Sequence, residues 1–382
     1  MRLIDVCDIN PRAQAIDDNL EVSFVAMPDV SEDGKINTGN IRSYCEVKKG
    51  FTCFQEGDVL FAKITPCMEN GKGALAVGLK NGIGCGSTEF HVLRPNTEVL
   101  QGQWLYYLTS WSAFRKDAER HMTGSAGQKR VPKAYLEKYE LQIPTLSEQL
   151  YQVKSLDRVK AVIELRKREL QSLDDLIKAR FVEMFGDPML NNMNFELRKY
   201  GGLFELNAGG TPSKAKTEYW DGGTISWIGS NMCQNTYIYE NDGNYITEDG
   251  MAHSSARMFP TDTVLVALVG ATIGKTALLK FETTTNQNVL GIRKIRENGY
   301  LPEFVFYYTQ GLYQKFLNIG DGGFAMASKG FISELPIPVV DIQLQKEFAT
   351  FVAQVDKSKA VVQKALDKAQ LLFDSLMQKY FG

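Results

Sequence analysis

Two long stretches of the chain contain neither glycine nor proline and repeat apolar residues every seven positions. The first lies between Pro144 and Gly186, and the second lies between Pro338 and Gly382. A sustained seven-residue repeat predicts a long helix whose apolar seam packs against another helix. The seam residues are Leu156, Ile163, Leu170, Ile177 and Met184 in the first stretch and Val355, Val362, Ala369 and Leu376 in the second. We therefore predict long helices over 147–186 and 339–382 that pack together as an antiparallel coiled coil.

The two remaining segments, 1–146 and 195–338, have the short-range pattern of β-rich domains. Brief runs of β-branched and aromatic residues, such as Thr263-Val264-Leu265-Val266, alternate with turn-forming clusters such as 207–212 and 320–323. Residues 187–194 hold one proline and three asparagines and are typical of a linker. The predicted fold class is α+β, in the order globular domain, long helix, linker, globular domain, long helix.

The second half of the chain repeats the first half at an offset near 200 residues. Two of the matches are residues 59–64 with 264–269 and the Gly-Lys pairs at Gly71-Lys72 and Gly274-Lys275. Three more follow in the same order, namely 87–94 with 286–293, 104–109 with 304–309, and 141–144 with 335–338. Five matches in one order predict an internal pseudo-twofold repeat.

Length and charge narrow the class of protein. The chain has 382 residues, which is more than one hydrophobic core usually supports. Its 43 basic and 45 acidic residues give a formal net charge of −2, which excludes a uniformly basic DNA-binding protein but is compatible with local basic patches. No apolar run is long enough to span a membrane, and the first residues lack the apolar core of a signal peptide. We therefore expect a cytoplasmic protein.

The six cysteines do not form a recognisable metal site, because no CxxC pair and no histidine at zinc spacing accompanies them. The chain is long and carries no export signal, so we expect these cysteines to be free thiols. They are Cys7, Cys45, Cys53, Cys67, Cys85 and Cys233.

We find no convincing catalytic motif, and we predict that this chain binds no metal or cofactor of its own. Residues 269–276 resemble a phosphate-binding P-loop, but Gly270 stands one position too close to the Gly274-Lys275 pair, so we predict a hairpin turn. Residues 82–86 are glycine-rich but lack the following helix pattern and acidic residue of a dinucleotide site. Residues 28–35 hold the letters of a metal nuclease motif at a spacing typical of a polar turn.

The order of two β-rich domains and two long helices resembles the specificity subunit of type I DNA restriction–modification systems. The resemblance covers nearly the whole chain, and its most specific motifs lie in the second domain. These motifs are Gly209-Gly210-Thr211-Pro212-Ser213, Tyr219-Trp220, and residues 225–228, 267–275 and 335–338. The first domain lacks Gly-Gly-Thr-Pro and departs more, as the resemblance implies if each domain reads a different half-site.

The resemblance implies a non-catalytic subunit that binds a bipartite DNA target, with one half-site per domain. In this family, modification subunits, of which we expect two, bring S-adenosylmethionine and methylate adenine at N6. Restriction subunits use ATP and magnesium to cleave unmethylated DNA. The long helices are expected to act as spacers and to dock these partners. Two alternatives remain open, namely the specificity partner of a type IIG-like restriction enzyme and a coiled-coil scaffold with two protein-binding heads and no role on DNA.

Candidate DNA contacts are polar and basic loop residues rather than whole basic domains. Residues 1–146 carry 17 basic and 18 acidic side chains, and residues 195–338 carry 12 and 14, so a basic face must be segregated within each domain. The candidates in the first domain are Lys63, Thr65, Lys72, Ser87, Thr88, Lys129 and Arg130. Those in the second domain are Lys214, Lys216, Tyr219, Ser230, Asn231, Thr272, Lys275 and Lys329.

Overall fold

A computed structural model describes residues 1–12, 16–125, 127–294, 299–319 and 326–382. The predicted turn at 320–323 lies outside the described residues. The chain divides into unit 1, which comprises Met1–Lys167 with Lys364–Gly382, and unit 2, which comprises Arg168–Gln363. None of the helices in the described ranges combines the length and the apolarity of a membrane span.

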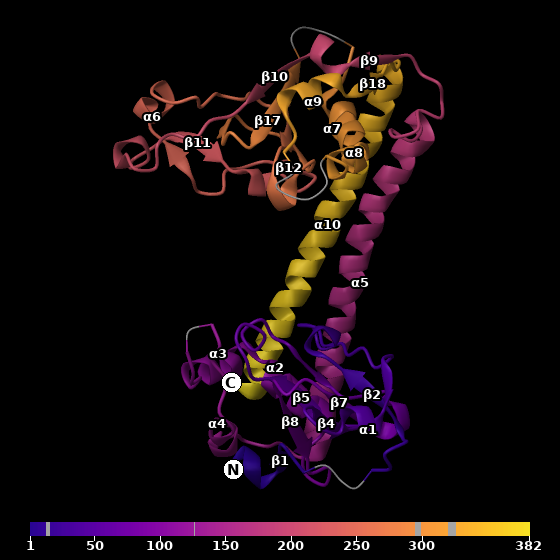
Figure 1. Ribbon diagram of the computed structural model, residues 1–382, viewed down its shortest axis with the longest axis vertical. Coiled ribbons are helices and arrows are strands. Elements are labelled where there is room, and N and C mark those ends of the chain that lie inside the picture. Colours follow the sequence, from indigo (N-terminus) through magenta and orange to yellow (C-terminus); the bar gives the residue numbers. More distant parts are fainter. Residues whose placement is uncertain (13–15, 126, 295–298, 320–325) are drawn as a thin grey trace. The chain divides into compact units, whose positions relative to one another are not determined.

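Within its described residues, unit 1 has two four-stranded sheets and, besides the long helices, four short α-helices. Figure 1 shows how these elements are arranged. The first sheet has the antiparallel order β1 (Cys7–Ile9), β8 (Phe90–Pro95), β5 (Val59–Ala62) and β6 (Gly73–Leu75). The second has the order β3 (Ile41–Ser43), β2 (Glu21–Val25), β7 (Ile83–Gly86) and β4 (Thr52–Gln55), in which β2 and β7 are parallel. The short helices are α1 (Tyr44–Val47), α2 (Gly102–Ser110), α3 (Ser112–Arg120) and α4 (Lys133–Lys138).

Unit 2 repeats this plan with one more strand in its main sheet. That sheet has the order β10 (Phe204–Ala208), β17 (Val289–Lys294), β14 (Val264–Ala267), β15 (Thr276–Leu279) and β12 (Thr236–Ile238). A three-stranded sheet has the order β13 (Tyr245–Ile246), β11 (Ile225–Ile228) and β16 (Thr284–Thr285), and β18 (Pro336–Pro338) pairs with β9 (Leu197–Lys199). The short helices are α6 (Glu248–Ala252), α7 (Pro302–Gly311), α8 (Tyr313–Leu317) and α9 (Lys329–Glu334).

Strand registers confirm the predicted internal repeat. Ala62 pairs with Phe90 across β5 and β8, and Ala267 pairs with Val289 across β14 and β17, so the two sheets agree strand by strand. The residues between β14 and β15 form a hairpin turn, as predicted, because these two strands are antiparallel neighbours.

One of the five sequence matches is out of register. The main-chain oxygens of Pro144 and Val340 accept equivalent hydrogen bonds from Gln149 and Gln345. Residue 144 therefore corresponds to residue 340 and not to residue 338. The proline that ends each matched run in the sequence does not mark the same place in the fold.

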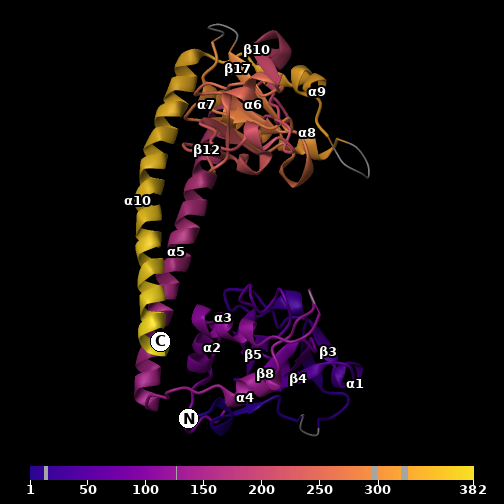
Figure 2. The ribbon, with the colours of Figure 1, turned by 90° about the vertical axis from the view of Figure 1, so that its left-hand side faces the viewer.

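The long helices α5 (Leu146–Phe185) and α10 (Ile342–Phe381) each contain 40 residues. In unit 1, Val153 and Leu156 near the start of α5 share a core with Met377 near the end of α10. In unit 2, Phe181 near the end of α5 shares a core with Phe348 near the start of α10. Start meets end in both units, so the helices are antiparallel, as predicted, and Figures 1 and 2 show them side by side within each unit.

The predicted seam residues differ in burial. Leu156, Ile163, Ile177, Val355, Val362 and Ala369 are buried. Leu170, Met184 and Leu376 are half-buried. Near the helix ends the apolar face widens beyond a single seven-residue seam, because Phe181 and Met377 are also buried there against the globular cores.

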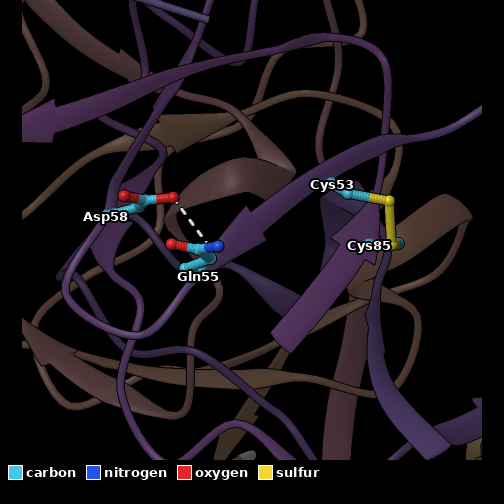
Figure 3. Close-up of a disulfide and its surroundings, with 4 residues drawn as sticks. All are labelled: Cys53, Gln55, Asp58 and Cys85. Atoms are coloured by element: carbon cyan, nitrogen blue, oxygen red, sulfur yellow. Dashed lines mark hydrogen bonds between the residues drawn. A yellow bond between two sulfur atoms is a disulfide. The ribbon is translucent and has the colours of Figure 1, made fainter. Parts of the chain in front are cut away.

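Cysteine pairing differs from the expectation of free thiols. Cys53 on β4 and Cys85 on β7 are directly opposite in the antiparallel register and form a disulfide (Figure 3). The other four cysteines are free. The partners are 32 positions apart in the sequence, which hides this pairing, and only the strand register brings the two side chains together.

Candidate nucleic-acid interface

In unit 1, several predicted contact residues meet where β5 ends. The backbone N–H of Lys63 donates to Glu89 O at 2.9 Å, and Val131 N–H donates to Lys63 O at 2.9 Å. The backbone N–H of Thr65 donates to Lys129 O at 3.0 Å. Three segments that are far apart in the sequence therefore form one edge. That edge carries Lys63, Thr65, Ser87, Thr88, Lys129 and Arg130.

Arg130 at this edge is held by an acidic neighbour. Its guanidinium donates to both carboxylate oxygens of Glu89, at 2.9 and 2.8 Å. These hydrogen bonds hold the pKa of Glu89 below its ordinary value, and Glu89 therefore keeps its charge next to the basic side chains. Lys129 is exposed. The ion pair with Glu89 thus fixes the Arg130 guanidinium, whereas the neighbouring Lys129 side chain is exposed to solvent.

A cavity of about 430 Å³ lies beside this edge and is lined by Lys63 and Thr88. Tyr44, Lys48 and Phe51 also line it, although the sequence analysis did not single them out. Phe51 is 38% exposed, and its ring meets the ring of Phe24 edge-on with centroids 5.0 Å apart. The available signal was the pair of aromatic residues, Tyr44 and Phe51, on either side of the Lys48-Lys49 pair, since nucleic acids offer both phosphates and stacking faces.

Two predicted contacts of unit 1 are engaged within the fold. The ammonium group of Lys72 donates to Met27 O at 3.1 Å. The Thr65 hydroxyl donates to a carboxylate oxygen of Glu69 at 2.7 Å. The Lys72 side chain is therefore held by Met27, although its main chain is bonded to Ala62 beside Lys63, and the Thr65 hydroxyl is directed back into its own turn.

In unit 2, four predicted residues gather around the turn between β14 and β15. Lys275 Nζ donates to Gln234 Oε1 at 2.9 Å, and Gln234 Nε2 donates to Asn231 O at 2.9 Å. Ser230 and Asn231 form a short helical turn beside them, and Thr272 O accepts from Lys275 N–H at 2.9 Å. The sequence analysis did not include Gln234, which connects the two loops.

The remaining candidates of unit 2 lie in two other places. Tyr219 is buried, and its hydroxyl accepts a hydrogen bond from Lys216 Nζ at 2.8 Å, so the two side chains are held together. Lys214 is exposed in the same loop. That loop meets the β16–β17 turn, where the Thr211 hydroxyl donates to Gln287 Oε1 at 2.5 Å. Lys329 is exposed at the first residue of α9.

Equivalent backbone positions carry different side chains in the two units. Leu268 N–H donates to Asn288 O at 2.8 Å, and Ala327 N–H donates to Leu268 O at 2.9 Å, as Lys63, Glu89 and Val131 do in unit 1. The turns at Ser87 and Asn286 also match, because each side-chain oxygen accepts from the backbone N–H two residues later. One scaffold therefore presents Lys63, Thr88 and Glu89 in unit 1 and Leu268, Gln287 and Asn288 in unit 2.

The described residues contain no cluster of three or more histidine, cysteine or carboxylate side chains able to share a metal ion. The edges in the two units instead contain cations, amides, hydroxyls and aromatic rings. Such groups bind phosphates and base edges by hydrogen bonding and charge.

Curated proteins of known class are similar to parts of this chain. The chain is 41% identical over 175 residues to the type I restriction enzyme EcoAI specificity subunit of Escherichia coli. The match covers 45% of this chain and 30% of that protein. It is also 30% identical over 188 residues to the MjaIX specificity subunit of Methanocaldococcus jannaschii, covering 47% and 43% of the two chains. The matched stretches thus span less than half the length of these relatives.

Solved structures share the fold across the whole chain. A chain from a type I R-M system solved for its complex assembly and conformational transition superposes with a TM-score of 0.62 at 18% identity, covering 99% of this chain and 96% of that one. The S subunit from M. genitalium superposes with a TM-score of 0.55 at 14% identity, covering 100% and 95%. The profile of the type I restriction modification DNA specificity domain matches residues 1–175 and 192–370. With both halves matched, the chain belongs to the type I restriction–modification DNA specificity family.

Proposed function

We propose that this chain is the non-catalytic subunit that recognises DNA in a type I restriction–modification complex. Each unit reads one half-site of a bipartite target. The observation that carries the proposal is the repeated scaffold, in which equivalent hydrogen-bonded turns present Lys63, Thr88 and Glu89 in one unit and Leu268, Gln287 and Asn288 in the other. Leu268 is buried, so the polar groups that differ are those of Lys63, Thr88 and Glu89 against Gln287 and Asn288. Two copies of one frame with such different side chains suit two different base sequences.

The chemistry of the candidate residues divides into two roles. Lys63, Lys129 and Lys275 are suited to phosphates, because an ammonium group binds a phosphate as a point charge without reading the sequence. The Thr88 hydroxyl and the Gln287 amide are suited to base edges, because they both donate and accept hydrogen bonds. Neither residues 1–146 (17 basic, 18 acidic) nor residues 195–338 (12 basic, 14 acidic) carry a net positive charge, so we expect partner subunits to supply further phosphate contacts.

We further propose that α5 and α10 dock the partner proteins. Beyond their buried faces these helices expose large apolar side chains, including Leu165 (54% exposed), Val361 (68%) and Leu371 (71%). Exposed apolar rows on a helix are typical of a protein-binding surface. The partners are two modification subunits, which bring S-adenosylmethionine for adenine methylation, and restriction subunits, which use ATP and magnesium.

Genome-wide mapping of N6-methyladenine in the host, with and without this gene, tests the DNA-recognition role. We expect a bipartite methylated motif to disappear with the gene. Replacing residues 195–338 with those of a relative should change one half-site and leave the other. An unchanged methylome, together with a purified modification complex that shows no sequence preference on duplex DNA, would instead favour the protein-binding scaffold.

Lengthening both helices tests their proposed role as spacers. Seven residues inserted into each helix keep the apolar seams in phase and add roughly 10 Å of helix, which corresponds to about three base pairs. We expect the gap between the half-sites to widen by that amount. An unchanged gap in a complex that still methylates DNA would contradict the spacer role.

A further inference from the structure

Unit 2 contains a cavity of about 610 Å³ that adjoins the DNA-contact candidates on one side, where Gln234, the acceptor for Lys275, lines it. It is lined by residues from both long helices, from α7 and from the segment around β12. The residues that matter below are Asp174, Tyr237, Tyr307, Gln310, Asp356 and Lys359. Its volume is within the range of sites that bind a ligand or a peptide segment.

The equivalent place in unit 1 is filled by the protein itself. Lys160 Nζ donates to Asp33 O at 2.5 Å, and Lys35 forms an ion pair with Glu164 at 3.5 Å. Gly34 packs so tightly against Tyr106 that an added Cβ atom would overlap its hydroxyl. A turn over residues 33–35 therefore fills the space between α2 and α5.

Pseudo-symmetry places the cavity at this same position. Gln149 and Gln345 are equivalent, and the same offset of 196 residues relates Lys160 to Asp356 and Glu164 to Ala360. Both Asp356 and Ala360 line the cavity. In unit 2 the connection that follows β11 forms the extra strand β12 on the main sheet, whereas the connection that follows β2 in unit 1 folds onto α5. The connection after β11 pairs with the main sheet through β12, and it therefore does not fill the cavity.

The equivalent helix positions 160 and 356 carry opposite charges, since unit 1 has Lys160 and unit 2 has Asp356. In unit 1 the Lys160 ammonium donates to a main-chain oxygen of the inserted turn. In unit 2 the corresponding residue is Asp356, which can only accept hydrogen bonds when ionised. Lys359 lies 2.6 Å from Asp174 but 3.8 Å from Asp356, so it is committed mainly to Asp174. Burial raises the pKa of Asp356, and the opposing effect of Lys359 does not cancel this shift.

A second group in the cavity also lacks a complement. The buried amide nitrogen Nε2 of Gln310, a hydrogen-bond donor, has no acceptor among the described residues. A backbone carbonyl of an inserted turn would satisfy it, as a basic side chain would satisfy Asp356. Both needs are met by a peptide with a cationic residue, because its carbonyl oxygen can accept from Gln310 and its cation can pair with Asp356. The two lysines that line the cavity are engaged elsewhere, Lys359 with Asp174 and Lys178 with Asp175.

We propose that this cavity binds a turn of a partner polypeptide that inserts a lysine or arginine side chain toward Asp356. The inference rests on the function proposed above, and the partner is accordingly a modification subunit. The inserted turn takes the place that residues 33–35 occupy in unit 1. Only one of the two units therefore receives the partner in this way, so the pseudo-symmetric chain docks its modification subunits unequally.

Site-specific photo-crosslinking identifies the occupant. Tyr239 lines the cavity and is 67% exposed, so a photo-crosslinking amino acid at this position reports on whatever enters. In the assembled complex with duplex DNA we expect a crosslink to a modification-subunit peptide, beside a lysine or arginine. The same amino acid at Val77, an exposed residue of unit 1, is the control. A crosslink from position 239 to DNA, or none to a partner protein, would overturn the inference.

Binding measurements with variants test the charge and the space separately. Asp356→Lys copies the charge of Lys160 and should weaken binding of the modification subunit about tenfold or more, with a smaller loss for Asp356→Asn. Ala360→Trp fills the cavity from an exposed helix position and should weaken binding without disturbing the core. Asp374→Asn, an exposed carboxylate on the same helix, is the matched control. Circular dichroism checks that each variant is folded.

The outcomes separate this inference from the proposed function. Equal affinities for wild-type, Asp356→Lys and Ala360→Trp chains, together with an unchanged bipartite methylation motif, would overturn the docking site and leave the DNA-recognition role intact. If the Asp356→Lys and Ala360→Trp chains assemble more weakly, and excess modification subunit restores methylation of the wild-type motif, the result would support both the docking site and the DNA-recognition role. A wild-type complex that assembles but methylates without sequence preference would overturn the DNA-recognition role.

Discussion

Gln149 and Gln345 make the same three hydrogen bonds at the first turn of the two long helices. Gln149 Oε1 accepts from Gln101 N–H at 2.9 Å, and its Nε2 donates to the main-chain oxygens of Val99 and Pro144 at 2.8 and 2.9 Å. Gln345 binds Leu301, Gly299 and Val340 in the same way, at 2.9, 2.9 and 3.0 Å. Both side chains are fully buried. Each glutamine thus joins three chain segments of its unit, including the beginning of α2 or α7.

Replacing either glutamine should destabilise its unit. Gln149→Leu leaves one buried N–H without an acceptor and two carbonyl oxygens without a donor, so we expect the free energy of unfolding to fall by about 3 kcal/mol. Gln345→Leu should do the same in unit 2. Urea unfolding followed by circular dichroism measures the loss. Gln354→Leu, at an exposed position of α10, should change stability by no more than about 0.5 kcal/mol. Equal stabilities for all three variants would contradict the proposed anchoring.

Removing a single cation from either candidate interface should weaken DNA binding without changing which sequence is preferred. For Lys63→Ala and Lys275→Ala we expect weaker binding of the assembled complex, and a salt dependence of log K that is shallower by about one. Lys116→Ala, which removes an exposed lysine of α3, is the control. Fluorescence anisotropy over a series of salt concentrations measures both quantities. An unchanged salt slope would place the affected lysine outside the phosphate contacts.

A change at a base-reading position should alter one half-site alone. Thr88 and Gln287 lie in equivalent turns, so Thr88→Val and Gln287→Leu should each relax specificity at a different half-site of the methylated motif. Each lost pair of hydrogen bonds corresponds to about 1–3 kcal/mol of discrimination between bases. Methylation sequencing of DNA modified by each complex is the measurement. Relaxation of both half-sites by one substitution would argue against independent reading by the two units.

Because His91 is buried, we expect the folded chain to lose stability in mild acid. This histidine lies on β8, its Nε2–H donates to Val131 O at 2.8 Å, and Nδ1 lies 3.0 Å from Asn10 Nδ2. Burial lowers the pKa of His91, although the hydrogen bond to Val131 opposes this shift. When folding lowers the pKa of a histidine, its contribution to the stability of the folded state is fully present above the ordinary pKa of 6.5. That contribution is lost as the pH falls from there through the folded value.

Urea midpoints at about pH 7.5 and about pH 5.5 test this assignment. His91→Gln keeps a donor and an acceptor but does not titrate in this range, so its midpoint should fall less on acidification than that of the wild-type chain. His253→Gln, at an exposed position, should behave like wild type. Equal acid sensitivity of all three chains would exclude His91 as the titrating group.

The first half alone, residues 1 to about 190, should form a symmetric dimer. In unit 1, Leu156 shares a core with Met377, whose counterpart in the first half is Phe181 at the same 196-residue offset. A second copy of the fragment offers Phe181 in place of Met377, and covering each such apolar side chain contributes roughly 1.5–3 kcal/mol. Light scattering after size-exclusion chromatography should show a dimer. With modification subunits this dimer should recognise an inverted repeat of one half-site, and a folded monomer at micromolar concentration would refute the prediction.

The long helices and the repeat were determined by the sequence itself. A helix seam is a local periodicity, so Leu156, Ile163 and Ile177 identify it without reference to the rest of the chain. The repeat is equally visible, because equivalent strands such as 59–62 and 264–267 retain similar residues in the same order. The motifs of the second domain carried the family resemblance for the same reason.

The tertiary structure alone decided which distant residues meet. Cys53 and Cys85 pair because β4 and β7 are neighbours in one register, and Glu89 reaches Arg130 because two loops converge on the end of β5. Gln149 and Gln345 look like ordinary helix residues in the sequence, and their buried roles depend on chain segments about 50 residues away. The cavity at Asp356 depends on whether a loop folds inward or adds a strand. Such choices depend on packing and hydrogen bonding between distant segments, which local sequence patterns do not encode.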